Sequence, residues 1–347
     1  MSAIHRERVP GGGAVGQWWH ELDDGRIQCD LCPRLCRLRE GQRGFCFVRL
    51  RENGRIILDT YGRTSGLAID PIEKKPLYHV RPGTTVLSFG TAGCNLACKF
   101  CQNWNISKSR EIDALHVAAE PTQIAEIAVR HGCDSVAFTY NDPTIFAEYA
   151  IDSAIACHEL GIRAIAVSAG YISPEPRAQM YRHMDAANID LKAFSEDFYW
   201  KLTGTHLAPV LETIAYVAQE TDCFLELTTL VIPEHNDSPD ELRRLTEWIL
   251  AECGPDTPLH FSAFHPDWKM RDVSRTPLST LRMAREIAME AGLNYVYLGN
   301  VREPEAAATY CPACSAVVVE RDGYRTPRIH VRDGACHRCG TSIAGVW

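Results

Sequence analysis

Residues 90–105 read GTAGCNLACKFCQNWN and carry three cysteines in the spacing C-x3-C-x2-C. The cysteines are Cys94, Cys98 and Cys101, and the aromatic Phe100 directly precedes the third. The β-rich run TTVLSF comes just before this stretch and predicts a buried strand that ends at Gly90. Three thiols therefore follow the carboxyl end of a strand, where an α/β barrel places its catalytic residues.

Three cysteines are one fewer than a closed metal site needs. A structural zinc ion takes four protein ligands, and a [4Fe–4S] cluster ordinarily takes four thiolates. Three thiolates leave one iron open. The spacing, with its aromatic residue, resembles the signature of the radical S-adenosylmethionine (SAM) enzymes, in which the open iron binds SAM and the reduced cluster cleaves it to a 5′-deoxyadenosyl radical. Three buried structural thiols, or a zinc site completed by a distant residue, are the alternatives.

The composition limits the class of protein. The chain has 347 residues, 46% of them hydrophobic, which suits a barrel with appendages. A net charge of −8 argues against a nucleic-acid partner. The N-terminal residues lack the apolar core of a signal peptide, and no apolar run approaches a membrane span. We therefore expect a cytoplasmic protein without a membrane partner.

In a cytoplasmic chain, fifteen cysteines point to metal sites rather than disulfides. Eleven of them fall in three tight groups. The other four are expected to be small buried side chains: Cys133, Cys157, Cys223 and Cys253.

Residues 1–82 are interpreted as an N-terminal Cys-rich metal-binding module and linker. Cys29, Cys32, Cys36 and Cys46 follow the spacing x2, x3, x9, which lacks the paired C-x2-C knuckles of zinc ribbons. Two interpretations remain. A structural zinc, or another structural metal, is slightly favoured because such sites are common in short appended modules. The other is an auxiliary iron–sulfur cluster that relays electrons.

The end of that range, residues 70–79, reads DPIEKKPLYH and predicts an extended loop across the barrel mouth. Lys74, Lys75 and His79 are candidates for contact with an anionic group of a substrate or cofactor. A solvated linker explains the same charges.

Residues 83–303 alternate between β-rich runs and amphipathic stretches, which predicts βαβ units and a parallel sheet. Seven strands fit a partial (β/α) barrel of the α/β class. Strands are expected at 84–89, 135–140, 164–168, 187–191, 224–230, 260–264 and 295–298. Helices are expected at 121–131, 145–160, 174–183, 209–220, 239–252 and 277–291, several of them with proline near the start and glycine after the end.

Polar side chains directly past these strands should share one face with the three cysteines. SAM needs acceptors for its ammonium group, a cation for its carboxylate and partners for its ribose hydroxyls. The chosen candidates are Asn141, Asp142, Ser168, Asp190 and Lys192.

Several motifs together resemble one family more closely. They are CDLCPRLC, PIEKKPLYHV-RPG, GCNLACKFCQNW, TYNDPTIFAEY, IDLKAF with FYWKLTG, and LGNV. This set is similar to the radical SAM enzyme of the AmmeMemoRadiSam system, which is related to pyruvate formate-lyase activating enzymes. The resemblance implies that Asn141 and Asp142 hold the SAM amino group, and that Asp190 and Lys192 lie near its methionine and ribose.

Two features depart from that family, and each role has a plain alternative. Position 142 is Asp where Glu is usual, and the segment VSAG around Ser168 lacks the acidic side chains that would bind a monovalent cation. Asp142 before Pro143 suits a helix cap, and Asp190 with Lys192 suits an ordinary ion pair.

Two histidines at the ends of the sixth predicted strand offer a further catalytic possibility. His260 and His265 lie at the start and just beyond the end of the predicted strand 260–264. A buried histidine with satisfied hydrogen bonds is the alternative for either one.

Residues 304–347 predict a zinc ribbon. Cys311 and Cys314 form one C-x2-C knuckle, and Cys336 and Cys339 form another, with 21 residues between them. Four thiolates close a structural site, and a hairpin of 316–320 with 328–331 is expected between them. Rubredoxin-like iron is the alternative metal.

Three functions are consistent with these patterns. The first is a glycyl-radical activase acting on a partner protein. The second is a radical SAM enzyme acting on a small molecule or another protein residue, with Memo-like or AMMECR-like partners. The third is a non-enzymatic metal-binding interaction module. Either enzyme would need a low-potential electron donor such as flavodoxin or ferredoxin.

Overall fold

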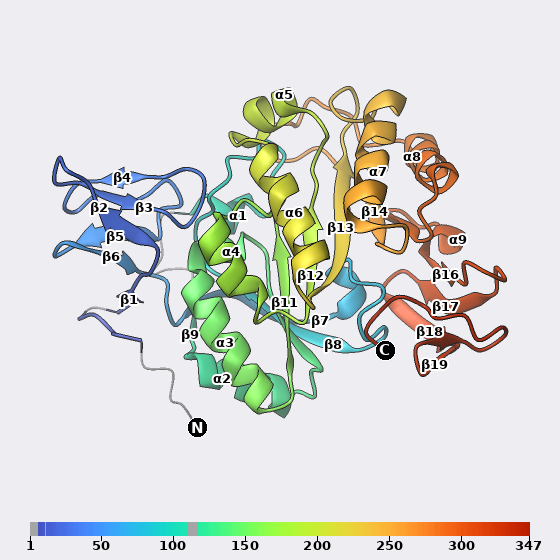
Figure 1. Cartoon of the computed structure of the whole chain (residues 1–347), viewed down its shortest axis with the longest axis horizontal. Helices are drawn as coiled ribbons and strands as arrows, with labels where there is room; N and C mark the ends of the chain where they lie inside the picture. The colour runs from blue at the N-terminus through green and yellow to red at the C-terminus, as the bar shows by residue number, and fades with distance from the viewer. Residues whose placement is uncertain (1–5, 11, 110–116) are drawn as a thin grey trace.

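The computed structural model describes residues 6–10, 12–109 and 117–347. At its centre is a nine-stranded sheet with the order β15-β14-β13-β12-β11-β10-β8-β7-β9 (Figure 1). Seven neighbouring strands are parallel, and the ends of the sheet do not pair with each other within the described residues, so the barrel is partial. These strands are β8 (Thr85–Gly90), β10 (Ser135–Phe138), β11 (Arg163–Ser168), β12 (Ala186–Asp190), β13 (Phe224–Val231), β14 (Leu259–Ala263) and β15 (Val296–Gly299).

Helices cover the outer face of this sheet, and Figure 1 shows α4, α6 and α7 over the middle strands. All six expected helices are confirmed: α2 (Pro121–Arg130), α3 (Ala147–Glu159), α4 (Pro174–Tyr181), α6 (Ala208–Glu220), α7 (Pro239–Cys253) and α8 (Leu278–Ala291). Helix α7 shows the local cause. The Ser238 side chain accepts a hydrogen bond from the Glu241 amide, and Gly254 ends the helix at φ +89°.

The segment before β8 differs from the expected extended loop. Strand β7 (Arg63–Pro71) pairs antiparallel with β8 and also with β9 (Val117–Ala118), so the central sheet reaches back to Arg63. A 3-10 turn, η1 (Ile72–Lys74), follows. Beyond it the chain is buried, because apolar side chains at every few positions pack inside the barrel against strand residues. They are Ile72, Leu77 and Val80, packed with Val86, Ala137, Ile165 and Ala186.

A buried polar network holds this segment inside the barrel. The Glu226 carboxylate pairs with His260 at 2.6 Å and accepts the backbone amides of Tyr78 and His79 at 3.0 and 2.8 Å. His79 uses both ring nitrogens, one with the Tyr297 hydroxyl and one with the carbonyl of Ala344, each at 2.6 Å. His79 therefore links the buried segment to the C-terminal residues through hydrogen bonds, and it is not placed to bind an anionic substrate or cofactor.

This arrangement predicts a pH-dependent stability. Burial lowers the pKa of His79 to about 4, whereas an unfolded histidine titrates near 6.5. The stability that the neutral, buried His79 contributes to the folded protein is present above about pH 6.5. The free energy of unfolding should fall by about 2 kcal/mol as the pH drops from 6.5 to 5. Denaturant unfolding at both pH values measures this. His79→Gln should show a smaller fall, and an equal fall in the variant would contradict the assignment.

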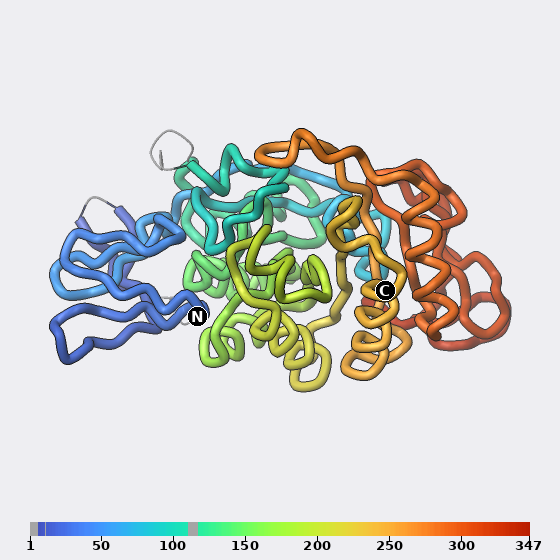
Figure 2. Tube along the Cα trace, turned by 90° about the horizontal axis from the view of Figure 1, so that it is seen from above, coloured from blue at the N-terminus to red at the C-terminus, as the bar shows by residue number. Residues whose placement is uncertain are grey.

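The N-terminal module consists of two small antiparallel sheets that lie on one side of the barrel (Figures 1 and 2). One sheet contains β1 (Ala14–Val15), β6 (Arg55–Leu58) and β5 (Arg49–Glu52), and the other contains β2 (Trp19–Glu21), β3 (Ile27–Cys29) and β4 (Arg37–Leu38). Arg49 joins the module to helix α3, because its guanidinium donates to both carboxylate oxygens of Glu148 at 2.8 Å.

The C-terminal residues form a ribbon on the opposite side of the barrel (Figure 1). After the short helix α9 (Pro304–Ala307), the expected hairpin is present as β17 (Val317–Asp322) and β18 (Arg325–Ile329), with β16 (Thr309–Tyr310) beside β17. Strands β19 (Val331–Arg332) and β20 (Ala335–Cys336) complete it. None of the helices in the described ranges is long and apolar enough to cross a membrane.

Candidate functional site

The loop with Cys94, Cys98 and Cys101 runs from β8 to the short helix α1 (Trp104–Ser107), and neighbouring elements hold its backbone. After helix α5 (Glu196–Phe198), the π-helical turn η3 (Tyr199–Thr203) presents two carbonyls to it. The amide of Ala97 donates to Thr203 at 2.7 Å, and that of Lys99 donates to Leu202 at 2.9 Å. The FYWKLTG motif therefore shapes the cysteine loop.

Two side chains donate hydrogen bonds to carbonyl groups of the same loop. Asn141 donates to Gly93 at 2.9 Å, and Lys108 donates to Leu96 at 2.6 Å. Asn141 thus supports the backbone beside the first cysteine while it also faces the adjoining cavity.

A cavity of about 310 Å³ opens in front of the three cysteines. Of the eight residues expected here, seven line it: Cys94, Cys98, Cys101, Asn141, Asp142, Asp190 and Lys192. They come from the ends of different parallel strands, as the sheet topology requires. Further lining residues that we did not single out from the sequence as ligands include Tyr140, Asn188, Thr228 and Asn300. Each of these residues lies within a strand or just past its end, and this position is the feature of the sequence that could have identified them.

The spacing of the three sulfurs distinguishes the two metal interpretations. Among the described residues, the sulfurs of Cys94, Cys98 and Cys101 do not all lie within 4.8 Å of one another. One zinc ion would draw its thiolates to about 3.8 Å, given zinc–sulfur bonds of about 2.3 Å. A cubane carries each thiolate on a different iron and so keeps them farther apart. The donor set therefore fits a [4Fe–4S] cluster with one iron free of a cysteine.

Asp190 and Lys192 form an ion pair of 2.7 Å on the cavity wall. Burial opposes the charge of Lys192, but Asp190 and the Cys98 sulfur outweigh it and raise the pKa of the ammonium group. The ammonium also lies 6.0 Å from the ring centre of Phe100. A fixed positive charge thus stands close to the sulfur-lined end of the cavity.

Asp142 already has a structural role. Its carboxylate accepts from the amides of Thr144 at 2.9 Å and Ala169 at 2.8 Å, and from the Ser168 hydroxyl at 3.1 Å. It caps η2 (Pro143–Phe146), and only 1% of it is exposed. These contacts favour the capping alternative, and Ser168 lies behind Asp142 rather than on the cavity wall.

The other polar candidates near the barrel mouth are also paired. Lys74 and Lys75 each contact Asp70 at 2.7 Å, and only Lys74 also lines the cavity. His260 is buried against Glu226, as expected for a core histidine with a satisfied hydrogen bond. His265 lies outside the cavity, where its ring nitrogen is 3.3 Å from the Gln102 amide.

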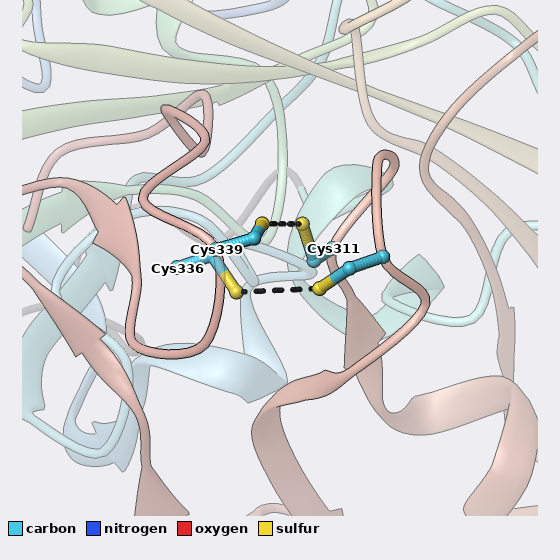
Figure 3. Close-up of side chains that lie close together, drawn as sticks. Cys311, Cys336 and Cys339 are labelled. Carbon is cyan, nitrogen blue, oxygen red and sulfur yellow. Dashed lines mark hydrogen bonds between the residues drawn. The ribbon is translucent and has the colours of Figure 1, made fainter.

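The four ribbon cysteines converge on one point, as Figure 3 shows. The sulfurs of Cys311 and Cys339 are 3.6 Å apart, those of Cys314 and Cys336 are 3.7 Å apart, and all four lie within 4.8 Å of one another. These separations match the roughly 3.8 Å expected around a tetrahedral zinc ion. The ribbon therefore contains a four-thiolate site that could bind zinc.

Three of the four isolated cysteines are buried as expected, and the fourth is not fully buried. Cys133, Cys157 and Cys223 are buried, and Cys253 is half-buried. None of these four cysteines is among the residues that line the cavity.

The parallel partial barrel with its three-cysteine loop coincides with a family match: the model of the radical SAM superfamily matches residues 89–246, so this part of the chain is a radical SAM domain. One relative is the uncharacterized protein MJ0808 of Methanocaldococcus jannaschii, 42% identical over 328 residues, which are 94% of this chain and 97% of the relative. Another is the 4-hydroxyphenylacetate decarboxylase activating enzyme of Clostridioides difficile, 25% identical over 44% of this chain and 51% of its own length. A radical SAM methyltransferase from Sphaerobacter thermophilus shares the fold, with a TM-score of 0.50, 14% identity and coverage of 62% of this chain and 66% of the other.

Proposed function

We propose that this protein reductively cleaves SAM and uses the resulting 5′-deoxyadenosyl radical to abstract a hydrogen atom. The observation that carries the proposal is the single cavity that three separated cysteine sulfurs share with Asp190 and Lys192. Cys94, Cys98 and Cys101 would hold a [4Fe–4S] cluster, which supplies one electron to the sulfonium of SAM when bound. The protein is proposed to act in the cytoplasm with a low-potential donor such as flavodoxin or ferredoxin.

The chain's own residues would orient SAM. Lys192 offers a cation to the carboxylate of its methionine part, and Asp190 and Asn141 offer oxygen acceptors to its ammonium and ribose groups. Asp142 and Ser168 would act mainly by shaping the wall, because their polar atoms bond to each other and to Ala169. The buried side of the cavity excludes water from the radical.

Removing the charge of Lys192 tests this assignment. Lys192→Met should raise KM for SAM by about 10- to 100-fold, since a hydrogen bond to a charged group contributes roughly 1.5–3 kcal/mol. Lys201→Met is the matched control, because that lysine is exposed on η3 and pairs with Asp197. Equal KM values for the Lys192 variant and the wild type would contradict a role in SAM binding.

A second cavity points to where the substrate enters. It has a volume of about 480 Å³ and lies between β14, β15 and the ribbon hairpin. It shares Lys74, Pro76, Ser262 and Asn300 with the SAM cavity, so the two spaces adjoin. Its walls carry both charge signs, including Glu73, Arg275 and Asp322. We infer that a polar substrate reaches the radical from this side.

The activating-enzyme relative supports a glycyl residue of a partner protein as the hydrogen donor. The alternative is a small molecule or another protein residue, with Memo-like or AMMECR-like partners, if the chain is the radical SAM enzyme of the AmmeMemoRadiSam system.

The test is anaerobic incubation of reconstituted protein with SAM and dithionite. Release of 5′-deoxyadenosine is expected, and its absence from a protein with full iron content would overturn both enzyme readings in favour of a metal-binding interaction module. Deuterium transfer from a glycine-labelled partner into 5′-deoxyadenosine would identify the activase reaction. Zinc is proposed at the ribbon, and metal analysis should find one zinc ion there per chain.

A further inference from the structure

The N-terminal cysteines form a group that the SAM site does not use. Cys29, Cys32 and Cys46 are buried and Cys36 is half-buried, and none forms a disulfide. The amide of Cys29 bonds to the carbonyl of Cys36 at 2.9 Å, and the amide of Phe45 points to the Cys36 sulfur at 3.4 Å. These two bonds hold Cys36 next to Cys29 and next to the residue before Cys46.

The sulfurs of these four cysteines are less closely grouped than those of the ribbon. No three of the four sulfurs lie within 4.8 Å of one another among the described residues, whereas all four ribbon sulfurs do. A single tetrahedral ion needs the closer spacing. This observation reverses the slight preference for zinc that the sequence alone supports, and it favours a cluster with one thiolate on each of four irons.

The module touches the SAM-site loop directly. Gly93, which precedes Cys94, has φ +85° and lies so close to the carbonyl oxygen of Cys46 that an added Cβ would be 2.1 Å from it. Only glycine permits this approach. Cys46 and Cys98 also belong to one continuous apolar core. Backbone next to one cysteine group thus packs against backbone next to the other.

A side chain joins the same two loops. Arg34, between Cys32 and Cys36, donates to the carbonyl of Asn95, which follows Cys94, and to that of Gly204 at 2.8 Å. Its guanidinium also stacks 3.6 Å from the ring centre of Phe45. These contacts fix the module against the SAM-site loop.

We propose that Cys29, Cys32, Cys36 and Cys46 bind a second [4Fe–4S] cluster that passes electrons to the SAM site. Four thiolates occupy all four irons, so this cluster has no open position and serves as an electron carrier. A low-potential one-electron donor reduces it from the 2+ to the 1+ state. It then returns to 2+ as the cluster at Cys94, Cys98 and Cys101 gains the electron. The binding site stands independently of SAM cleavage, whereas the relay rests on the proposed function.

Metal analysis of a triple variant, Cys94→Ser, Cys98→Ser and Cys101→Ser, tests the binding site without any activity assay. After anaerobic reconstitution the variant should keep about four iron and four sulfide per chain, against about eight of each in the wild type. Its dithionite-reduced form should show the electron paramagnetic resonance signal of a reduced [4Fe–4S] cluster. Loss of all iron, with or without a second zinc ion, would overturn the proposal.

A second variant tests the relay. Replacing all four N-terminal cysteines with serine should remove about four iron per chain while the ribbon metal stays, which verifies that the barrel and ribbon remain folded. Cleavage of SAM driven by flavodoxin should fall at least about tenfold relative to cleavage driven by dithionite, which can reduce the SAM site directly. An unchanged ratio would overturn the relay. If the variant without the four N-terminal cysteines does not fold, the metal content of the triple variant still decides whether the second cluster binds.

Discussion

Cys98→Ala protein, reconstituted without oxygen and given SAM and dithionite, is expected to release 5′-deoxyadenosine at least about 10³-fold more slowly than wild type, equivalent to roughly 4 kcal/mol in the barrier. Cys98 lies in the middle of the loop, and its sulfur faces both Lys192 and the cavity. With two thiolates left, the proposed cluster would lose one of its three protein ligands next to the proposed SAM position. Product release measured by chromatography over a fixed time gives the comparison.

Cys157→Ala is the matched control, because Cys157 is a buried thiol within α3 and does not line the cavity. It should keep activity within about twofold and stability within the small cost of a minor core truncation. If the Cys98 variant retained wild-type activity with full iron content, the three-cysteine site would not be the place of SAM cleavage.

The second large effect concerns the buried ion pair between the N-terminal module and helix α3. Glu148→Gln should lower the opening free energy of the module by about 3–5 kcal/mol, since breaking a buried pair strands a charge. Arg49 is 1% exposed, and its guanidinium reaches both oxygens of Glu148, which also accepts the Gln17 amide at 2.6 Å. Native-state hydrogen exchange of amides in β5 and β6 reports this opening.

An exposed pair provides the comparison for that measurement. Asp197→Asn breaks the ion pair with Lys201, in which the Asp197 side chain is 78% exposed and the Lys201 side chain 65%. This change should alter the free energy of unfolding by less than about 1 kcal/mol. If hydrogen exchange in β5 and β6 were the same in the Glu148 variant and the wild type, the ion pair would not secure the module. A loosened module should also weaken the contact between Cys46 and Gly93.

Local sequence patterns predicted the barrel elements well. The seven parallel strands and six outer helices form within a few residues of their expected ends, because hydrophobic periodicity and the Pro and Gly signals act over neighbouring residues. Strand β7 and the buried segment after it were not predicted. Its polar residues, such as Glu73 and His79, indicate a solvated loop unless their distant partners Thr326 and Tyr297 are known.

The candidate site divides in the same way. Cysteine spacing and strand ends were enough to select seven of the residues that line one cavity. The place of Ser168 behind Asp142, the carbonyls that η3 offers to the loop, and the second cavity beside the ribbon depend on contacts across the fold. Such contacts leave no periodic trace in the chain.

The amino-acid sequence by itself determined the three cysteine groups, the order of strands and helices, and hence the class of chemistry, since ligand type and spacing are local properties. Only the tertiary structure decided how far apart the sulfurs of each group lie and which loops touch. Those distances depend on long-range packing: the carbonyl of Cys46 meets Gly93 because the module docks on the barrel through Arg34 and Arg49. Folding therefore brings the four ribbon sulfurs close together, whereas the sulfurs of the other two cysteine groups stay farther apart. The loops of these two groups touch where the module packs on the barrel.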